Sequence, residues 1–346
     1  MKILITGGSS FTGYWFIKEL AARGHAITAV VRGNRDQYTG LRKDRIEQVA
    51  QWAEIVWNCS FGDDTFIQLL DNGYDAVCHH GAQVENYKSP DFDVAAALHS
   101  NTFHARAVFE RLKSAGAGQF IVTGSVFEAG EGLGNPPLIA FSPYGLSKTI
   151  SWEVFRYWSW KLSVPITKFV IPNPFGPYEE PRFCNFLIQT WKKGEVPAIN
   201  TPDYIRDNIH ADLLARYYAL AVESHHRAHT GGSRHHDQSG GSHDPARTIG
   251  SGSPAVPKDG NNPVTLIRCY GPSGYIESQG AFATRFAAEM AKRLPLRCEI
   301  RLNRQTAFDE PLIRTNDAAT DGLIPGWNEQ QAWDDLAAYY HNHLLK

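Results

Sequence analysis

The stretch Thr6-Gly7-Gly8-Ser9-Ser10-Phe11-Thr12-Gly13 directly follows the apolar run Met1–Ile5. A strand, a glycine-rich turn and a helix in this order are typical of a phosphate-binding turn, in which glycines allow the bend, the close approach of a pyrophosphate and helix packing. A serine replaces the usual middle glycine. We predict a dinucleotide site, with the helix amides and the Ser10 hydroxyl directed at phosphate oxygens; a turn without a ligand is the alternative. The predicted contacts here are Gly7, Ser10, Phe11 and Gly13.

Short apolar segments alternate with helical segments along the first half of the chain. Alternation at this spacing is typical of a parallel sheet with helices on both faces. We therefore predict an α/β fold with a doubly wound parallel sheet of the Rossmann type, and ligands beyond the carboxyl ends of its strands. The predicted strands are 2–5, 26–31, 55–59, 76–79 and 119–123, and the predicted helices are 13–23, 64–72 and 93–115.

The texture of the sequence changes at the turn-rich stretch Pro172–Tyr178. We predict a dinucleotide-binding Rossmann domain over residues 1–172, to which 205–222 returns, and a smaller substrate-binding part over 173–346. Residues 223–262 are rich in Gly, Ser and His, and such a composition cannot form a core. We expect a flexible surface insertion there. Metal capture by its histidines is the alternative, but no acidic or cysteine partners fix a geometry, so no metal site is predicted.

The composition excludes several classes of partner. The chain has 346 residues and a formal net charge of −2, and no apolar run approaches the length of a membrane span. Neither nucleic acid nor a membrane is therefore an expected partner. Because the first predicted strand begins at the start of the sequence, we expect no signal peptide. Five dispersed cysteines are typical of reduced cytosolic thiols, so we expect a cytoplasmic protein.

A second signal is Tyr144-Gly145-Leu146-Ser147-Lys148, with Ser125 about twenty residues earlier at the end of a predicted strand. Residues four apart share one face of a helix, and a nearby ammonium favours phenolate and lowers the pKa of a tyrosine. We predict that Tyr144 is an acid/base, with Lys148 and Ser125 as its catalytic partners. An exposed Tyr–Lys pair without such a role is the alternative, which the glycine turn and Ser125 disfavour.

These motifs, in this order, resemble the extended short-chain dehydrogenases/reductases that act on nucleotide sugars, the NAD-dependent epimerase/dehydratase family. The resemblance runs from Met1 to about Ala221 and is looser after Val264. It rests on TGGSSFTG at 6–13, Gly62-Asp63, His80–Gln83, Asn101, Thr123–Ser125, Tyr144–Lys148, Asn173–Pro177 and Arg206–His210.

The resemblance implies roles for individual residues. Tyr144 would be the catalytic acid/base and Ser125 its partner, while Lys148 would hold the nicotinamide ribose. A homodimer built from the helices near 93–115 and 144–161 is also implied. Capping is the alternative for one of the implied contacts, Asp63, and a structural salt bridge for another, Arg206. The further implied contacts are Asp63, Gly81 and Ala82 for the cofactor, Asn173 and Arg206 for a sugar diphosphate, and Arg314 for the nucleotide.

The end of the second strand indicates which cofactor binds. A site that prefers NAD usually has a carboxylate there, which accepts hydrogen bonds from the ribose hydroxyls. Here Val31 holds that position, and Arg32 and Arg35 follow. Guanidinium groups suit a 2′-phosphate. We therefore predict NADP, bound through Arg32, with NAD as the alternative; arginines that merely face solvent are the other interpretation.

The residues after Ser125 bear on the reaction. Dehydratases of the family carry an acidic pair directly after the catalytic Ser/Thr, whereas Val126 and Phe127 stand here and the first acid is Glu128. The resemblance thus disfavours a dehydratase and implies an NAD(P)-dependent nucleotide-sugar oxidoreductase, an epimerase that passes through a transient keto-sugar by hydride transfer. The alternatives are an NADPH-dependent nucleotide 4-keto-sugar reductase, a reductase of a small hydrophobic ketone held by the aromatic residues of 152–160, and a non-catalytic NADP-binding sensor.

Overall fold

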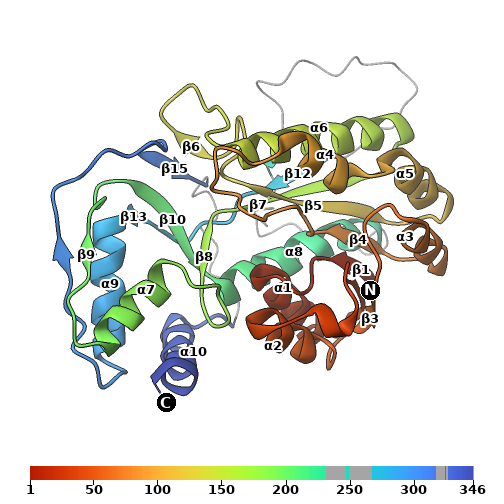
Figure 1. The fold of residues 1–346 in the computed structure, drawn as a ribbon. Coiled ribbons are helices and arrows are strands. Elements are labelled where there is room, and N and C mark those ends of the chain that lie inside the picture. Colours follow the sequence, from red (N-terminus) through yellow and green to blue (C-terminus); the bar gives the residue numbers. More distant parts are fainter. Residues whose placement is uncertain (231–246, 249–266, 317–323, 325, 346) are drawn as a thin grey trace, which may run out of the picture.

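The computed structural model describes residues 1–230, 247–248, 267–316, 324 and 326–345. Its largest sheet has eight strands, all paired in parallel except the first two in spatial order. This arrangement confirms the predicted α/β fold with a Rossmann-type sheet (Figure 1). In spatial order the strands are β11 (Arg247–Thr248), β12 (Ile267–Tyr270), β7 (Ile166–Ile171), β5 (Gln119–Ser125), β4 (Ala76–His79), β1 (Lys2–Thr6), β2 (Ala26–Val30) and β3 (Glu54–Val56).

Helices cover both faces of this sheet (Figure 1). Successive side chains of a strand point to opposite faces, so Ile3 packs in one core with Phe16 and Tyr218, whereas Leu4 packs in the other with Phe109. The first core lies under α1 (Phe11–Ala22), α2 (Gly40–Val49) and α8 (Ala211–Thr230), and the second under α3 (Asp64–Leu69), α5 (Ala105–Ser114) and α6 (Pro143–Leu162), with α4 (Val94–Thr102) against α6.

The single helix predicted over 93–115 is wrong, because the chain bends between α4 and α5. His104 has a φ of 48°, a left-handed conformation. The bend fits closely against Gly62, where a Cβ would lie only 1.9 Å from the Phe103 oxygen. The His104 Nδ1 lies 3.1 Å from the Gly62 oxygen. A contact between segments about forty residues apart thus interrupts a helical pattern that is locally continuous.

A smaller part, at the left of Figure 1, has its own core around Phe282, Phe286 and Trp333. Its helices are α7 (Phe183–Lys192), α9 (Gln279–Ala291) and α10 (Glu329–Tyr340). Its main sheet has the order β13 (Tyr275–Ser278), β10 (Ile205–His210), β15 (Ile313–Thr315) and β6 (Leu133–Gly134), with β8 (Asn173–Phe175) also paired to β10. Two short strands, β9 (Ala198–Ile199) and β14 (Arg301–Leu302), pair separately.

The chain passes repeatedly between the two parts. β6, which lies between β5 and α6 in the chain, belongs to the smaller sheet. Residues 205–222, which were predicted to return to the Rossmann domain, are shared between the two parts. β10 lies in the smaller sheet, whereas α8 packs on α1. β12 then returns to pair with β7. Of the predicted insertion over 223–262, residues 223–230 form the end of α8 and 247–248 form β11, while 231–246 and 249–262 lie outside the described residues.

The described residues also bear on membranes and metals. None of their helices combines the length and the apolar character needed to cross a bilayer. In the same part of the chain, no three or more His, Cys, Asp or Glu side chains gather as metal ligands. All five cysteines are free thiols. The cytoplasmic location stays a prediction.

Candidate active site

A cavity of about 910 Å³ lies at the carboxyl ends of the parallel strands. It begins at the turn after β1, passes the ends of β2, β4 and β5, and reaches the segment between β7 and β8. Ligands of open α/β sheets bind at this edge. The predicted site residues that line it are Gly7, Ser10, Phe11, Arg32, Gly81, Ala82, Ser125, Tyr144, Lys148 and Asn173; Gly13, Asp63, Arg206 and Arg314 are not among its lining residues.

The glycine turn is held in shape by close backbone contacts. Gly7 has a φ of 80°, which favours glycine, and a Cβ there would lie 2.8 Å from the Gly81 nitrogen. A Cβ at Gly13 would lie 2.2 Å from the Gly7 oxygen. Bare backbone therefore faces the cavity at the start of α1, which suits the close approach of a dinucleotide pyrophosphate to the helix amides.

Ser10 caps α1 from inside this turn. Its Oγ accepts a hydrogen bond from the Gly13 nitrogen at 3.1 Å and donates to the Gly7 oxygen at 2.8 Å. A cap of this kind stabilises a helix by about 1 kcal/mol. The Nε2 of His80 lies 3.0 Å from the same Oγ. The Ser10 hydroxyl is thus used within the protein, and the structure does not support its predicted donation to a phosphate.

His80 joins the glycine turn to β5; it was named only within the motif His80–Gln83, and no role was predicted for it. Its Nε2 also lies 2.9 Å from the Thr12 Oγ1, and its Nδ1 lies 3.0 Å from the Thr123 Oγ1. Burial, and then the charge of Lys148, lowers the pKa of His80 to about 3, so the ring is a neutral bridge near pH 7. The available signal was a pair of histidines, His79 and His80, at the end of an apolar strand.

Helix α6 carries Tyr144 in its first turn and Lys148 one turn later. Ser142 caps the helix by accepting from the Gly145 nitrogen at 3.0 Å, and Pro143 follows at the first helical position. A Cβ at Gly145 would lie 2.2 Å from the Phe127 oxygen. The first turn of α6 therefore packs directly on the loop after β5. The structure brings Tyr144, Lys148 and Ser125 to one cavity.

The charges around Tyr144 differ from the prediction. The Lys148 Nζ donates to the Thr123 oxygen at 2.6 Å, and burial lowers the pKa of Lys148. Burial raises the pKa of Tyr144, and the Glu128 carboxylate and then Tyr87 raise it further. The prediction that Lys148 lowers the pKa of the Tyr144 phenol is therefore wrong for this structure, in which that pKa is raised. The ammonium donates to a backbone carbonyl, and burial has the largest effect on the phenol.

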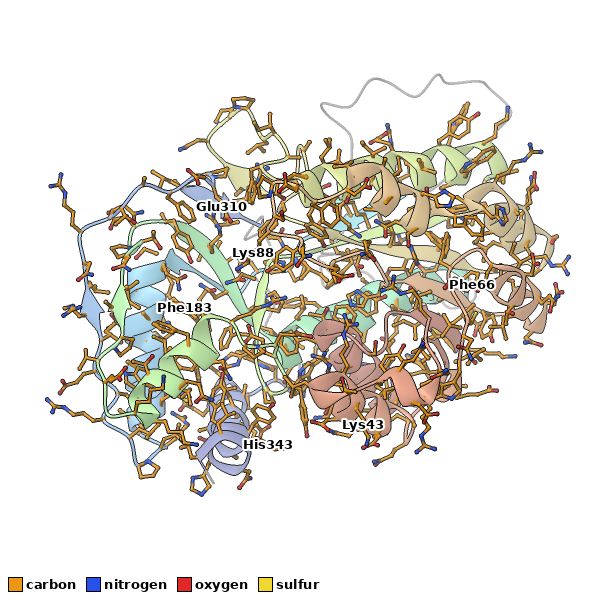
Figure 2. All side chains as sticks on the ribbon, in the orientation of Figure 1. Lys43, Phe66, Lys88, Phe183, Glu310 and His343 are labelled. Carbon is orange, nitrogen blue, oxygen red and sulfur yellow. The ribbon has the colours of Figure 1, made fainter. Side chains whose placement is uncertain are left out.

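Aromatic and basic side chains surround Tyr144. The ring of Tyr144 meets those of Tyr87, Phe92 and Phe127 edge-on, with centroids 5.6, 6.0 and 6.5 Å away. Lys88 and Arg182 lie 5.8 and 5.9 Å from the centroid of the Tyr87 ring. Figure 2 shows Lys88 between the large sheet and the smaller part. Tyr87, Lys88 and Arg182 all line the cavity, and none was predicted.

The aromatic residues of 152–160, which the alternative of a hydrophobic ketone would require around the substrate, do not line the cavity. Trp152 and Phe155 are buried in the core beneath α6, and Trp158 packs against that core. Tyr157 and Trp160 are exposed on the outer side of the helix. Their helical spacing therefore reflects packing and an exposed aromatic face rather than a substrate pocket.

Two predicted ligand contacts form structural bonds instead. Asp63 caps α3 and accepts from the Phe66 nitrogen at 2.7 Å, which was the alternative interpretation. Arg206 is only 5% exposed and donates to the Glu310 carboxylate at 2.9 Å. It also donates to the Pro311 oxygen at 2.9 Å. The structure therefore assigns Arg206 the salt-bridge role that was its alternative.

Arg314 is buried at the junction of the two parts. Its guanidinium donates to the backbone oxygens of Val126, Glu128 and Ile139 at 2.8, 3.0 and 2.6 Å. It thus holds the loop after β5 and does not face the cavity. By contrast, Asn173 does line the cavity, and its Nδ2 donates to the Asn208 Oδ1 at 2.5 Å.

The end of β2 presents basic side chains to the cavity. Arg32 is exposed, lines the cavity and donates to the Gln83 Oε1 at 3.3 Å. Arg42, on α2, lines the same cavity, whereas Arg35 does not. Sequence analysis missed Arg42, because only the path of the chain after β2 brings α2 to this edge.

The parallel sheet, the glycine turn and the serine, tyrosine and lysine around one cavity together define an extended short-chain dehydrogenase/reductase. The chain belongs to the NAD dependent epimerase/dehydratase family, whose model matches residues 3–233. The family resemblance found in the sequence is thereby confirmed.

Solved structures share this fold over 99% of the chain. A UDP-glucuronic acid 4-epimerase mutant from Bacillus cereus, in complex with a fluorinated UDP-sugar and NAD, is 16% identical with a TM-score of 0.70, and 99% of it is covered. A dTDP-glucose 4,6-dehydratase from Streptomyces venezuelae is 15% identical with a TM-score of 0.66, and 98% of it is covered. At such identities the likeness shows the fold alone.

A curated relative matches only part of the chain. It is an uncharacterized chloroplastic protein of Arabidopsis thaliana, 21% identical over 192 residues, which are 54% of this chain. The match covers 63% of that protein, so the chain spans less than two thirds of the relative's length. This relative carries no information on activity.

Proposed function

We propose that the protein is an NAD(P)-dependent nucleotide-sugar oxidoreductase, and that it is an epimerase. The observation that carries the proposal is the meeting of Ser125, Tyr144 and Lys148 with the glycine turn in one cavity. Family membership supports it. So do solved structures of the same fold that hold UDP-sugars and NAD. The dehydratase reaction of another neighbour has less support, because Phe127 follows Ser125 in the cavity where an acid would be needed.

The residues of the site divide the work of proton transfer and orientation. A nicotinamide dinucleotide, when bound, supplies the acceptor and donor of hydride. The phenolate form of Tyr144 takes the proton of the sugar hydroxyl as a ketone forms, and the phenol so produced returns that proton when the alcohol is restored. Ser125 Oγ accepts from the Phe127 nitrogen at 3.2 Å, so its own hydrogen remains for the substrate oxygen. Lys148 supplies a buried positive charge beside these groups.

A nucleotide 4-keto-sugar reductase is the second candidate, and the basic residues at the end of β2 favour it. Such an enzyme delivers hydride once and consumes NADPH. A reductase of a small hydrophobic ketone loses the support of residues 152–160, which lie away from the cavity. A non-catalytic sensor would have no use for the complete set of Ser125, Tyr144 and Lys148.

Incubation with a panel of nucleotide sugars, with and without added NADPH, tests the proposal. Redox-neutral conversion of one sugar to its epimer, detected by NMR, would establish the epimerase. Net oxidation of NADPH with a 4-keto-sugar would establish the reductase. If no nucleotide sugar on the panel is converted or bound, the proposal fails.

We propose NADP as the preferred cofactor, because Arg32 and Arg42 both face the end of β2. Replacing Arg32 with alanine should weaken NADPH binding about tenfold, which corresponds to about 1.4 kcal/mol, and leave NADH binding unchanged. Fluorescence titration with both cofactors measures this difference. Arg35→Ala is the matched control, because Arg35 lies outside the cavity lining and should affect neither cofactor. Equal losses for NADPH and NADH in the Arg32 variant would contradict a 2′-phosphate contact.

We also propose a homodimer formed through the outer face of α4, α5 and α6. Leu146, Tyr157 and Trp160 are exposed on α6, and Tyr157 is 51% exposed. Large exposed aromatic side chains on one helix are typical of a contact surface. Light scattering should give twice the chain mass for the wild type and the chain mass for Trp160→Glu. A monomeric wild type, or a variant that stays dimeric, would contradict this interface.

A further inference from the structure

A buried lysine in the middle of a core strand is the starting point. Lys168 lies in β7 (Ile166–Ile171), whose other residues are apolar except Thr167, and it is 2% exposed. A charge is seldom buried in a parallel sheet unless it is paired and bonded. Its Nζ lies 2.5 Å from the Glu128 Oε2 and 2.5 Å from the Glu131 Oε1. We call Glu128, Glu131 and Lys168 the charge cluster; the Glu131 side chain is 18% exposed.

Glu128 connects this cluster to the candidate catalytic serine. Its carboxylate has no exposed surface, and its Oε1 accepts the hydrogen bond of the Ser125 backbone nitrogen at 2.7 Å. One carboxylate oxygen therefore fixes the backbone of Ser125, while the other is held by Lys168. A charged acceptor makes this hydrogen bond stronger than a neutral one.

The packing around the cluster leaves the serine loop little freedom. A Cβ at Gly124 would lie 2.6 Å from the Lys168 Cε and 3.0 Å from the Glu128 Oε1, so a side chain beside Ser125 would press on both members of the ion pair. The Lys168 Nζ also lies 5.0 Å from the centroid of the Trp152 ring, on α6. The cluster thus touches both the element that ends in Ser125 and the helix that carries Tyr144.

The serine loop and α6 are joined by further bonds. The Ala129 nitrogen donates to the Thr149 Oγ1 at 2.9 Å, and that hydroxyl donates to the Gly145 oxygen at 2.9 Å. Gly145 in turn packs on the Phe127 oxygen. A shift of Glu128 would therefore displace Ser125 relative to Tyr144.

The charge of Glu128 also acts on the reactive pair. After burial, it is the largest contribution that raises the pKa of Tyr144; Tyr87 adds to it and Arg182 opposes it. Burial lowers the pKa of Lys148, which Glu128 opposes and Lys168 reinforces. Removal of the carboxylate charge at 128 should lower the pKa of Tyr144.

We propose that Glu128, held in place by Lys168, is a positioning residue that fixes the backbone of Ser125 and carries a buried negative charge on the loop against which the first turn of α6 packs. The proposal rests on the proposed hydride-transfer function. It assigns Glu128 no direct contact with substrate. It also gives the acid that follows Ser125 a role other than the elimination of water.

The test compares three variants with the wild type. Glu128→Leu combined with Lys168→Met removes both charges together, and apolar replacement of a buried ion pair is often neutral for stability. Glu128→Gln removes the charge and keeps an acceptor oxygen. Glu131→Gln is the matched control, because it removes the same charge from the side of the cluster that does not bond to Ser125. Melting temperatures establish which variants fold.

Three measurements follow, two of them on the nucleotide sugar that the wild type converts. In the double variant, the Ser125 amide should exchange hydrogen at least about tenfold faster, and kcat should fall at least about tenfold with KM within about twofold. In Glu128→Gln, the acid limb of the kcat profile should move to lower pH by about half to one unit, since one nearby charge shifts a pKa by this order. Glu131→Gln should stay closer to the wild type in all three.

Several results would overturn the proposal. A folded double variant with kcat within about twofold of the wild type would leave the cluster with a structural role alone. Equal effects of Glu128→Gln and Glu131→Gln would show that the link to Ser125 is not what acts. If the double variant does not fold, an unmoved acid limb in Glu128→Gln decides against the proposal. Failure of the wild type on every nucleotide sugar is a separate result, which removes the proposed function itself.

Discussion

Replacing Tyr144 with phenylalanine is expected to lower turnover at least about a hundredfold, the range that a positioned acid/base contributes. Phenylalanine keeps the ring that packs against Tyr87, Phe92 and Phe127 and loses only the proton-transferring hydroxyl. The melting temperature and the affinity for the dinucleotide should therefore stay close to those of the wild type. Initial rates on the converted nucleotide sugar, with cofactor titration beside them, measure both effects.

Tyr157→Phe is the matched control for this experiment, because Tyr157 lies on the same helix and is exposed on its outer side. It should leave the rate unchanged. A Tyr144→Phe protein that keeps more than about a tenth of the wild-type rate would remove Tyr144 from the mechanism. A variant that loses cofactor binding as well would show that the phenol holds the dinucleotide rather than the proton.

Gly13→Ala is expected to damage both stability and cofactor binding. The new Cβ would lie 2.2 Å from the Gly7 oxygen, and a backbone atom cannot move aside without opening the turn. Overpacking of this kind costs about 1 to 3 kcal/mol, so we expect the free energy of unfolding to fall by about 2 kcal/mol. Dinucleotide affinity should fall at least tenfold, because the turn presents the amides of α1. Denaturant unfolding and cofactor titration provide the two values.

Gly24→Ala separates backbone strain from the clash. Gly24 has a φ of 81°, but a Cβ there meets nothing within 4 Å. The left-handed conformation alone costs an alanine about 1 to 2 kcal/mol, so stability should fall without any change in dinucleotide affinity. If Gly13→Ala binds the dinucleotide as the wild type does, the turn does not have the role that its geometry indicates.

The fold could be predicted because its determinants are local and periodic. The continuous apolar run of Ile3, Leu4 and Ile5 already implies a strand with a core on each side, and the structure shows those two cores. The spacing of Tyr144 and Lys148 likewise implies one helical face. Patterns of this kind depend on neighbours within a few residues, and the tertiary contacts of these segments are consistent with the local preference.

The remaining features depend on partners that are distant in the sequence. Arg206 is paired with Glu310, more than a hundred residues away, and nothing near position 206 indicates that partner. The hydroxyl of Ser10 is taken up by its own turn and by His80, seventy residues later. The bend at His104 depends on its close contact with Gly62. Lys168 did carry a visible signal, a charge inside an apolar strand, but its partners became evident only in three dimensions.

The return of β12 to the edge of the large sheet has a consequence for how the molecule could be divided. Beside β7, β12 contributes a strand from residues 267–270, while β6 sends residues 133–134 the other way. No single cut of the chain therefore releases either part with its sheet complete, and a piece ending after α8 would leave the hydrogen-bonding edge of β7 bare. The smaller part therefore cannot be exchanged between proteins as one continuous segment of the chain.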